Sequence, residues 1–361
     1  MGSVVLAGNN LFVDPPAPPH TNVLAATLFP VPVCETSLSA RRASRRALQQ
    51  RRVMPFLRSA FIGLSRNRSL RRFFEHSALG TRLNARFIAG MQPEDALRVA
   101  EAVNRQGISV TLDSLGESVT SPTEAHQAAD VYHPLLDSIA ERGLDANISV
   151  KLTQMGLEQS PDLAEQIAEN LVQHARSAQS FVRIDMEDSR LTQDTLDIVR
   201  RVHSHAGLRG AVGVVIQAYL YRSQADIEQL LADGIRVRLC KGAYNEPPDV
   251  AFPRKAEVDA NFLRLAKMLV DSPIYHALAT HDEALIDKVK AYAAEAAIAP
   301  SHFEFQMLYG VRRDLQRKLV SEGYKVRVYV PFGSEWYPYF MRRLAERPAN
   351  VLFMAKNFFR A

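Results

Sequence analysis

Cysteine is scarce in this sequence, and long apolar runs are missing. Only Cys34 and Cys240 occur among the 361 residues, too few for a disulfide framework or a tetrahedral metal site. No stretch of about 18 apolar residues appears, so we expect no segment that crosses a bilayer. The first residues lack the charged start and apolar stretch of a secretory signal. We therefore expect a cytoplasmic protein in a reducing compartment, without a bound metal.

A basic surface is also missing from most of the chain. The formal net charge is +5, but residues 1–72 hold eleven arginines against Asp14 and Glu35. That segment carries +9, which leaves a net charge of −4 for residues 73–361. A mildly acidic main body argues against a nucleic-acid groove. We therefore expect no nucleic-acid partner.

The basic charge coincides with a segment of unusual composition. Residues 1–53 combine six prolines with an Arg/Ser/Ala/Gln run and show no apolar periodicity, which predicts a disordered basic extension. An organelle-targeting peptide is the alternative. The short basic segment 58–74 is amphipathic, and we expect it to cap the domain; peripheral contact with the inner face of a membrane is the alternative. Residues 54–361 are then one domain with N-terminal helices.

From residue 81 onward, short β-rich runs alternate with helical patterns. Several helix-start signals follow these runs: Ser121-Pro122, Ser160-Pro161, Ser223 with Asp226, and Asp282-Glu283. Eight such units in about 280 residues predict an α/β fold, a closed (β/α)8 TIM-type barrel. A doubly wound open sheet is the alternative, although it does not need eight units. The predicted strands are 108–113, 148–153, 181–186, 212–217, 235–240, 275–280, 303–308 and 325–330.

The barrel hypothesis predicts where polar residues lie. Catalytic groups of such barrels gather at the carboxyl ends of the strands, so polar residues are expected there and nowhere else along the strands. A single polar residue at a strand end is usually a turn former or a cap, but a full set in register indicates a site. The set is Asp113, Lys151 with Thr153, Asp185 with Glu187, Gln217, Arg238 with Lys241, Thr280 with His281, Gln306, and Tyr329.

The charges in this set favour an acidic ligand. Lys151, Arg238 and Lys241 lie in or beside buried strands, where an unpaired charge is costly. Asp185 and Glu187 are expected to neutralise part of this charge, and a bound carboxylate or phosphate the rest. A Gly-rich dinucleotide motif after a strand, a P-loop and an HExxH motif are all missing. Gly242, next to Lys241, marks either a turn or a close approach of backbone to a phosphate.

The last predicted helix, 336–346, carries a second polar feature. Tyr339, Arg342, Arg343 and Glu346 stand at i, i+3, i+4 and i+7, so they share one face. This face is either solvated or forms a two-arginine fork that binds a small carboxylate. We expect this final helix to lie over the barrel mouth.

At these residues the chain resembles the proline dehydrogenase family, over roughly residues 81–350. The resemblance implies an oxidoreductase of proline catabolism, a flavoprotein that oxidises L-proline to 1-pyrroline-5-carboxylate. It also implies hydride transfer from C5 of proline to N5 of FAD, and electrons passed to a quinone. The motifs are TLDSLGESV, ISVKLTQMG, FVRIDMEDSR, VGVVIQAYL, RLCKGAYNEPPDVAFP, ATHDE, FEFQMLYG and VYVPFGSEWYPYFMRRLAERPANV.

The resemblance also implies residue roles. Asp185 and Arg238 are expected to be catalytic, with Arg238 beside N5 of the flavin, and Tyr329 is expected to favour proline over hydroxyproline. The substrate-binding set is Lys151, Arg342, Arg343, Tyr244, Leu308, Tyr329 and Tyr339. The cofactor-binding set is Met186, Gln217, Arg238, Lys241, Gly242, Ala243, Thr280, His281 and Gln306.

Two rival hypotheses remain from the sequence alone. Methylenetetrahydrofolate reductase is another flavin-binding barrel, but it would not need the Tyr-x-x-Arg-Arg face of the last helix. In a non-enzymatic alternative the Arg-rich leader is a binding arm and the barrel is a scaffold. No aldehyde dehydrogenase region is seen, so the next step of proline catabolism is expected on a separate pyrroline-5-carboxylate dehydrogenase.

Overall fold

The computed structural model describes residues 77, 86–116, 118–339 and 341, and its centre is a closed parallel barrel. Each strand pairs with the next along the chain, and β8 pairs with β1 to close the ring. The predicted α/β barrel is confirmed, and the open-sheet alternative is wrong. The strands are β1 (Ser109–Ser114), β2 (Ala146–Val150), β3 (Val182–Ile184), β4 (Val212–Gln217), β5 (Arg236–Cys240), β6 (Ala277–Ala279), β7 (Glu304–Leu308) and β8 (Lys325–Phe332).

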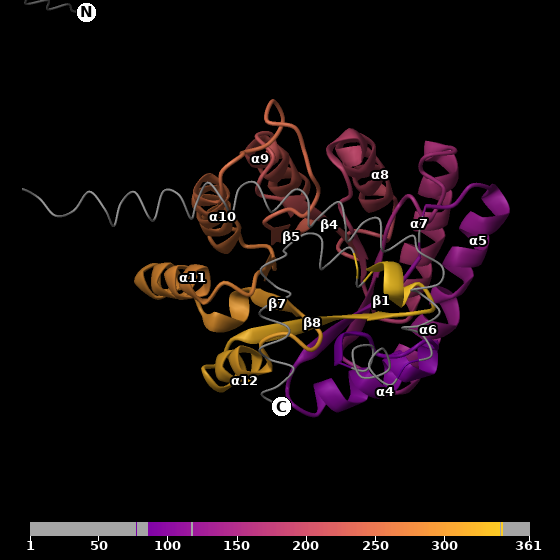
Figure 1. Cartoon of the computed structure of the whole chain (residues 1–361), viewed down its shortest axis with the longest axis horizontal. Coiled ribbons are helices and arrows are strands. Elements are labelled where there is room, and N and C mark those ends of the chain that lie inside the picture. Colours follow the sequence, from indigo (N-terminus) through magenta and orange to yellow (C-terminus); the bar gives the residue numbers. More distant parts are fainter. Residues whose placement is uncertain (1–76, 78–85, 117, 340, 342–361) are drawn as a thin grey trace, which may run out of the picture. The chain divides into compact units, whose positions relative to one another are not determined.

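Helices surround this barrel (Figure 1). Helix α4 precedes the first strand, as expected for an N-terminal helix, and residues 336–339 and 341 are helical after the last strand. Residues 1–53, the segment 58–74 and most of the predicted last helix lie outside the described residues. The helices are α4 (Pro93–Asn104), α5 (Pro122–Asp130), α6 (Tyr132–Glu141), α7 (Pro161–Ser177), α8 (Thr192–Ser204), α9 (Ser223–Asp233), α10 (Lys255–Val270), α11 (Glu283–Glu295) and α12 (Arg313–Ser321), with 3-10 turns at Ser189–Leu191 and Pro300–His302.

Two of the predicted helix starts are confirmed in detail. The Ser121 hydroxyl accepts a hydrogen bond from the Glu124 N–H at 3.3 Å, and the Ser160 hydroxyl accepts from the Leu163 N–H at 3.4 Å. Each serine is followed by a proline at the first helical position, where no N–H is needed. These caps fix where α5 and α7 begin.

The other two helix starts differ from the prediction. Ser223 is the first residue of α9 rather than its cap, and its hydroxyl donates to the carbonyls of Gln217 and Leu220. Asp282 precedes α11, but its side chain makes no capping bond. Its carboxylate instead accepts a hydrogen bond from the Lys241 ammonium group, with Nζ at 2.9 Å, and forms an ion pair with it. The sequence pattern predicted the positions of both starts correctly and the roles of the side chains wrongly.

The two faces of each strand have different environments. Residues such as Val237, Leu239, Phe305 and Met307 are buried and pack within the apolar core. Alternate residues face the barrel interior, as the period of two requires. The Cα pairing of Arg238 with Ala277, and of Ala277 with Glu304, shows that these inward positions are in register across β5, β6 and β7.

The barrel interior is polar along its length, so the expectation of polar residues only at the strand ends is wrong. Thr111 donates to Asn147 at 2.5 Å within β1 and β2, and Arg183 donates to the carbonyls of Val214 and Arg236. Near the amino ends, Arg327 Nε lies 3.0 Å from Glu304. Charges are tolerated at this depth because they are paired and hydrogen-bonded to one another or to carbonyls.

The described helices contain no candidate membrane span, since none is both long and apolar enough.

We predict that His276 makes the fold sensitive to acid. Burial, with Arg183 and Arg236 nearby, lowers the pKa of His276 to about 3, and its Nδ1 accepts from the Val237 N–H at 3.0 Å. The neutral ring therefore contributes stability above pH 6.5 that is lost as the pH falls toward 3. His276→Asn keeps an acceptor but cannot titrate. Its unfolding free energy should vary with pH less steeply below 6.5, by about 1 kcal/mol per pH unit.

The measurement is urea unfolding of both proteins at pH 7.0, 5.5 and 4.5. Parallel pH curves for the wild type and His276→Asn would show that the neutral ring is not required.

Candidate active site

Three charged side chains meet at the mouth of the barrel, where β1, β2 and β3 end. Lys151 Nζ donates to both oxygens of Asp113, at 3.0 and 3.2 Å, and lies 3.4 Å from Asp185 Oδ2. Asp113 is fully buried, and the Lys151 side chain is 26% exposed. One cation therefore serves two carboxylates and remains in reach of a ligand.

Asp185 is the most heavily bonded group of this cluster. It forms an ion pair with Arg238, and its oxygens accept from the hydroxyls of Ser149 at 2.6 Å and Tyr329 at 2.8 Å. Burial alone would raise the pKa of Asp185, but Arg238 and Lys151, with the two hydroxyl donors, lower it to about 2. Asp185 is therefore ionised throughout the physiological range.

The groups around Asp185 have shifted acidities of their own. Burial raises the pKa of Asp113, and Lys151 offsets only part of that effect. Burial lowers the pKa of Lys151, but the two aspartates raise it by more. The pKa therefore increases overall, and the lysine stays protonated. Burial and the neighbouring carboxylates raise the pKa of Tyr329, which keeps its phenol as a neutral donor. The cluster thus offers a fixed cation and a fixed hydroxyl donor beside an ionised carboxylate.

Arg238 reaches this cluster from β5 across the barrel. One guanidinium nitrogen donates to Asp185 and lies 3.3 Å from the Ser149 hydroxyl, and the other lies 3.4 Å from Gln306 Oε1. The guanidinium carbon is 5.2 Å from the centre of the Tyr329 ring, within cation–π range. The two residues predicted to be catalytic, Asp185 and Arg238, are therefore in direct contact.

A second set of contacts joins the ends of β2, β3 and β4. Glu187 accepts from Thr153, at 3.1 Å from the backbone N–H and 2.7 Å from the hydroxyl. The Gln217 amide donates to the Glu187 carbonyl at 2.7 Å. Glu187 is engaged with these neutral donors rather than with a cation. Its burial raises the pKa of its carboxyl group.

Lys241 has other partners than the sequence suggested. Its Nζ lies 2.6 Å from Asp259 and 2.9 Å from Asp282, so residues of α10 and of the loop before α11 neutralise it rather than Asp185 or Glu187. Gly242 has a φ of +106°, and a Cβ there would collide with the Tyr219 ring. A packing constraint within the protein thus requires this glycine. An approach of its backbone to a phosphate stays a prediction.

The remaining predicted residues occupy several environments. His281 Nε2 accepts from the Leu308 N–H at 2.9 Å, and Thr280 Oγ1 accepts from the Asp282 N–H at 3.1 Å. Met186 is buried, Leu308 and Tyr339 are half-buried, Ala243 is exposed, and Tyr244 is 43% exposed. Tyr339 is close enough to influence the pKa of Tyr329. Arg342 and Arg343 lie outside the described residues.

Sequence reasoning missed Ser149 and Tyr132, and it gave Asp113 no individual role. Asp113 stands in the strand-end series. Ser149 lies two residues before Lys151, so strand alternation puts both on the same side. The Tyr132 hydroxyl donates to the Ser149 carbonyl at 3.1 Å and accepts from the Ser114 N–H at 3.1 Å. Ser149 could have been noticed as a hydroxyl residue within an apolar strand sequence. Tyr132 belongs to α6, and no pattern in the sequence pointed to its contact with the barrel.

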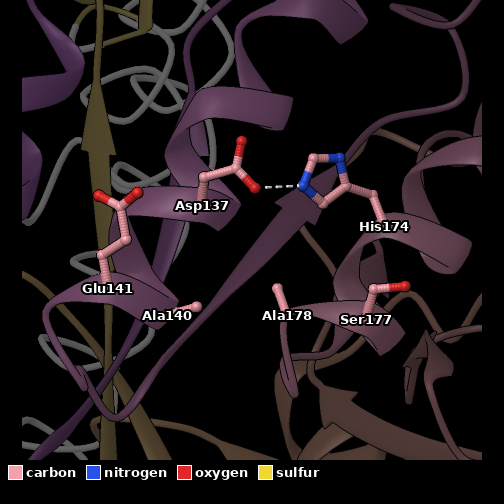
Figure 2. Close-up of a pocket in the computed structure, with 6 residues that line it drawn as sticks. All are labelled: Asp137, Ala140, Glu141, His174, Ser177 and Ala178. Atoms are coloured by element: carbon pink, nitrogen blue, oxygen red, sulfur yellow. Dashed lines mark hydrogen bonds and ion pairs between the residues drawn. The ribbon is translucent and has the colours of Figure 1, made fainter.

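The pocket drawn in Figure 2 is separate from this cluster. It lies between α6 and α7 and is lined by Asp137, Ala140, Glu141, His174, Ser177 and Ala178. His174 Nε2 lies 2.6 Å from Asp137, and His174 Nδ1 lies 2.8 Å from His133 Nδ1. None of the predicted site residues lines it. Among the described residues no group of three or more His, Cys, Asp or Glu side chains could hold a metal ion.

Comparison with known proteins adds an independent finding. A family model described as "Proline dehydrogenase" matches residues 96–356. Proline dehydrogenase 1 of Bacillus subtilis subsp. natto is 44% identical over 302 residues, which are 83% of this chain and 98% of that protein. Proline dehydrogenase of Deinococcus radiodurans is 41% identical over 280 residues, 76% of this chain and 89% of that protein.

A solved structure is also similar. Proline utilization A from Bdellovibrio bacteriovorus, inactivated by N-propargylglycine, has a TM-score of 0.72 and 25% sequence identity. The match covers 80% of this chain and 36% of that one, so the present chain spans about a third of the larger protein.

We predict that the charges at the mouth are energetically coupled. Lys151→Met removes the cation shared by two buried carboxylates and should destabilise the fold by about 2 kcal/mol, below the usual cost of breaking a buried pair because Lys151 is partly exposed. Adding Asp113→Asn removes the carboxylate that Lys151→Met leaves without its ion pair, since Asp185 still pairs with Arg238, and should restore part of the loss. The measurement is urea unfolding at pH 7, and strictly additive effects would contradict the coupling.

Proposed function

The chain belongs to the proline dehydrogenase family, and we propose that it is an FAD-dependent enzyme that oxidises L-proline to 1-pyrroline-5-carboxylate. The observation that carries the proposal is the contact of Lys151 and Arg238 with the ionised Asp185 at the barrel mouth. The family membership favours this reaction over folate reduction and over a barrel that serves only as a scaffold.

The chemistry of the residues at the strand ends fits a flavin. Gln217 ends β4 and Thr280 follows β6, whereas Arg238 and Gln306 are the middle residues of β5 and β7, so these four strands carry amide, hydroxyl and cationic donor groups at or near their carboxyl ends. The rim of a flavin ring and its pyrophosphate present the acceptors that such donors bind. We propose that these residues hold FAD, together with Met186, Lys241, Gly242, Ala243 and His281. When bound, the flavin supplies the hydride acceptor.

We propose that Arg238 acts beside the flavin, where its charge favours a reduced, anionic ring. Asp185 holds the guanidinium in place and lowers the cost of burying it. With its pKa held near 2, Asp185 is a poor proton acceptor at neutral pH. Its role is therefore electrostatic, and the proline amine must be neutral before hydride leaves its C5 atom.

The substrate carboxylate is assigned to Lys151, whose ammonium group stays protonated and is partly exposed. We propose that Arg342 and Arg343 complete this carboxylate site as a two-arginine fork. Tyr244, Leu308, Tyr329 and Tyr339 are the proposed walls around the pyrrolidine ring. The Tyr329 phenol, fixed on Asp185, would leave little room for a ring hydroxyl, which favours proline over hydroxyproline.

The two electrons removed from proline must leave the enzyme after each turnover. We propose that they pass to a membrane quinone, with the protein cytoplasmic and peripheral on the inner face of the membrane. The product 1-pyrroline-5-carboxylate is then consumed by a separate pyrroline-5-carboxylate dehydrogenase.

The proposed function is tested by anaerobic reduction. The purified protein should be yellow from bound FAD, and L-proline should bleach the flavin absorbance in the absence of oxygen. Lys151→Met should require a higher proline concentration for the same bleaching, because it lacks the carboxylate-binding cation. A flavin that L-proline leaves fully oxidised would overturn the proposal.

We predict that Arg343→Ala weakens proline binding by about 2 to 5 kcal/mol, as truncation of one partner of a desolvated charge pair does. The readout is the proline concentration that gives half-maximal flavin reduction. Arg98→Ala is a matched control, because Arg98 is an exposed arginine of α4 that pairs only with Asp95 among the described residues. Equal proline affinity in the two variants would remove Arg343 from the substrate site.

A further inference from the structure

A line of polar contacts runs inside the barrel from Arg238 toward the amino ends of the strands. Gln306 Oε1 faces Arg238 at 3.4 Å, and Gln306 Nε2 donates to Glu304 Oε1 at 2.5 Å. The Glu304 carboxylate also accepts from Arg327 Nε, at 3.0 and 3.1 Å, and from the Tyr275 hydroxyl at 3.0 Å. Glu304 and Gln306 are both buried.

The contact between Arg238 and Gln306 depends on the small residues of β6. Arg238 belongs to β5 and Gln306 to β7, so β6 lies between them. The residues of β6 in register with them are Ala277, paired with Arg238, and Ala279, paired with Gln306. Methyl groups leave open the space through which the guanidinium and the amide meet.

Glu304 decides which end of the Gln306 amide faces Arg238. An ionised carboxylate only accepts hydrogen bonds, so the amide must turn its NH₂ group toward Glu304. Its oxygen, an acceptor, is then left toward the guanidinium, which only donates. The opposite orientation would place two sets of donors against each other at Arg238, an unfavourable contact inside a buried site.

We propose that Glu304 is a positioning residue that acts on Arg238 through Gln306. Arg327 keeps the Glu304 carboxylate in place through contacts with both of its oxygens. Glu304 fixes the amide of Gln306, and the amide oxygen holds the terminal nitrogen of Arg238 that does not donate to Asp185. This inference rests on the proposed function, in which Arg238 favours the reduced flavin.

The test uses Glu304→Gln, which keeps the size of the side chain but can donate to Gln306 and release the fixed amide. In the holoenzyme the midpoint potential of the flavin is measured by reductive titration without proline. We expect the midpoint potential to shift in the negative direction by about 30 mV, which for a two-electron couple corresponds to about a tenfold change in the equilibrium between oxidised and reduced flavin. The kcat for proline should fall about tenfold while KM changes less than threefold.

Tyr275→Phe is the matched control, since it removes one hydrogen bond from the same carboxylate but leaves the contact with Gln306. It should leave the potential and kcat close to wild type. In a Gln306→Leu background, Glu304→Gln should cause no further shift, because the intermediary is gone. Equal shifts in Glu304→Gln and Tyr275→Phe, or an undiminished shift in the Gln306→Leu background, would reduce Glu304 to a structural role and overturn the proposal.

A readout without flavin separates this proposal from the proposed function. Urea unfolding of Glu304→Gln, Arg238→Met and the double variant should show coupling in the chain with its native Gln306 and none in the Gln306→Leu background. If L-proline fails to bleach the flavin but this coupling is found, the proposed function fails and the positioning contact stands. Missing coupling overturns the positioning role.

Glu304→Asp serves as a second variant if Glu304→Gln is insoluble. It withdraws the carboxylate from Gln306 but keeps the negative charge beside Arg327, and it should shift the flavin potential in the same direction.

Discussion

The carboxylate of Asp185 is the group on which the arrangement of the barrel mouth depends. It follows β3 and is held by Ser149 of β2, by Lys151 directly after β2, by Arg238 of β5 and by Tyr329 of β8. Without this anion, Arg238 would lose its ion pair inside a buried site while Lys151 kept the one with Asp113, and leaving a buried charge unpaired is costly. One side chain thus fixes the positions of a cation on each side of it and of a phenol donor.

The polar interior follows from the same requirement. A guanidinium in the middle of a barrel needs acceptors in several directions, and Asp185 supplies them on one side only. Gln306 supplies another, and its own amide is satisfied by Glu304. Glu304 in turn is balanced by Arg327, whose guanidinium also donates to the Val110 carbonyl at 2.8 Å. Each buried charge is therefore satisfied by the next, until the network ends on backbone carbonyls near the amino ends of the strands.

The barrel could be predicted well from the sequence because buried parallel strands appear as short apolar runs that alternate with helical patterns. Val212–Gln217 was predicted and observed with the same bounds, and Ser121 and Ser160 marked helix starts through local hydrogen bonds. The strand-end pattern likewise selected Asp185, Arg238 and Tyr329, which the structure brings into contact at the barrel mouth. These features depend on residues close together in the chain or on a regular period.

The partners of the charged groups could not be predicted in the same way. Lys241 binds Asp259, a residue of α10 brought near by the long connection after β5, and no periodicity encodes that approach. Tyr132 reaches Ser149 from α6, so its role depends on how a helix packs on the barrel. Glu304 and Arg327 face the barrel interior, contrary to the expectation that polar residues lie only at the strand ends. Each charge is stable there because the other neutralises it. The sequence of one strand alone does not show such a pair.

The environments of Asp113 and Asp185 show how pairing sets chemical role. Both carboxylates are buried and both contact Lys151, yet the pKa of Asp113 is raised and that of Asp185 is lowered. The difference is the second cation, since Arg238 pairs with Asp185 alone of the two. Arg238 therefore keeps Asp185 ionised, and the ionised Asp185 keeps Arg238 at the mouth. The geometry of the guanidinium and the charge of the carboxylate depend on each other, so a change that displaces Arg238 also changes the electrostatics that Lys151 and its ligand experience.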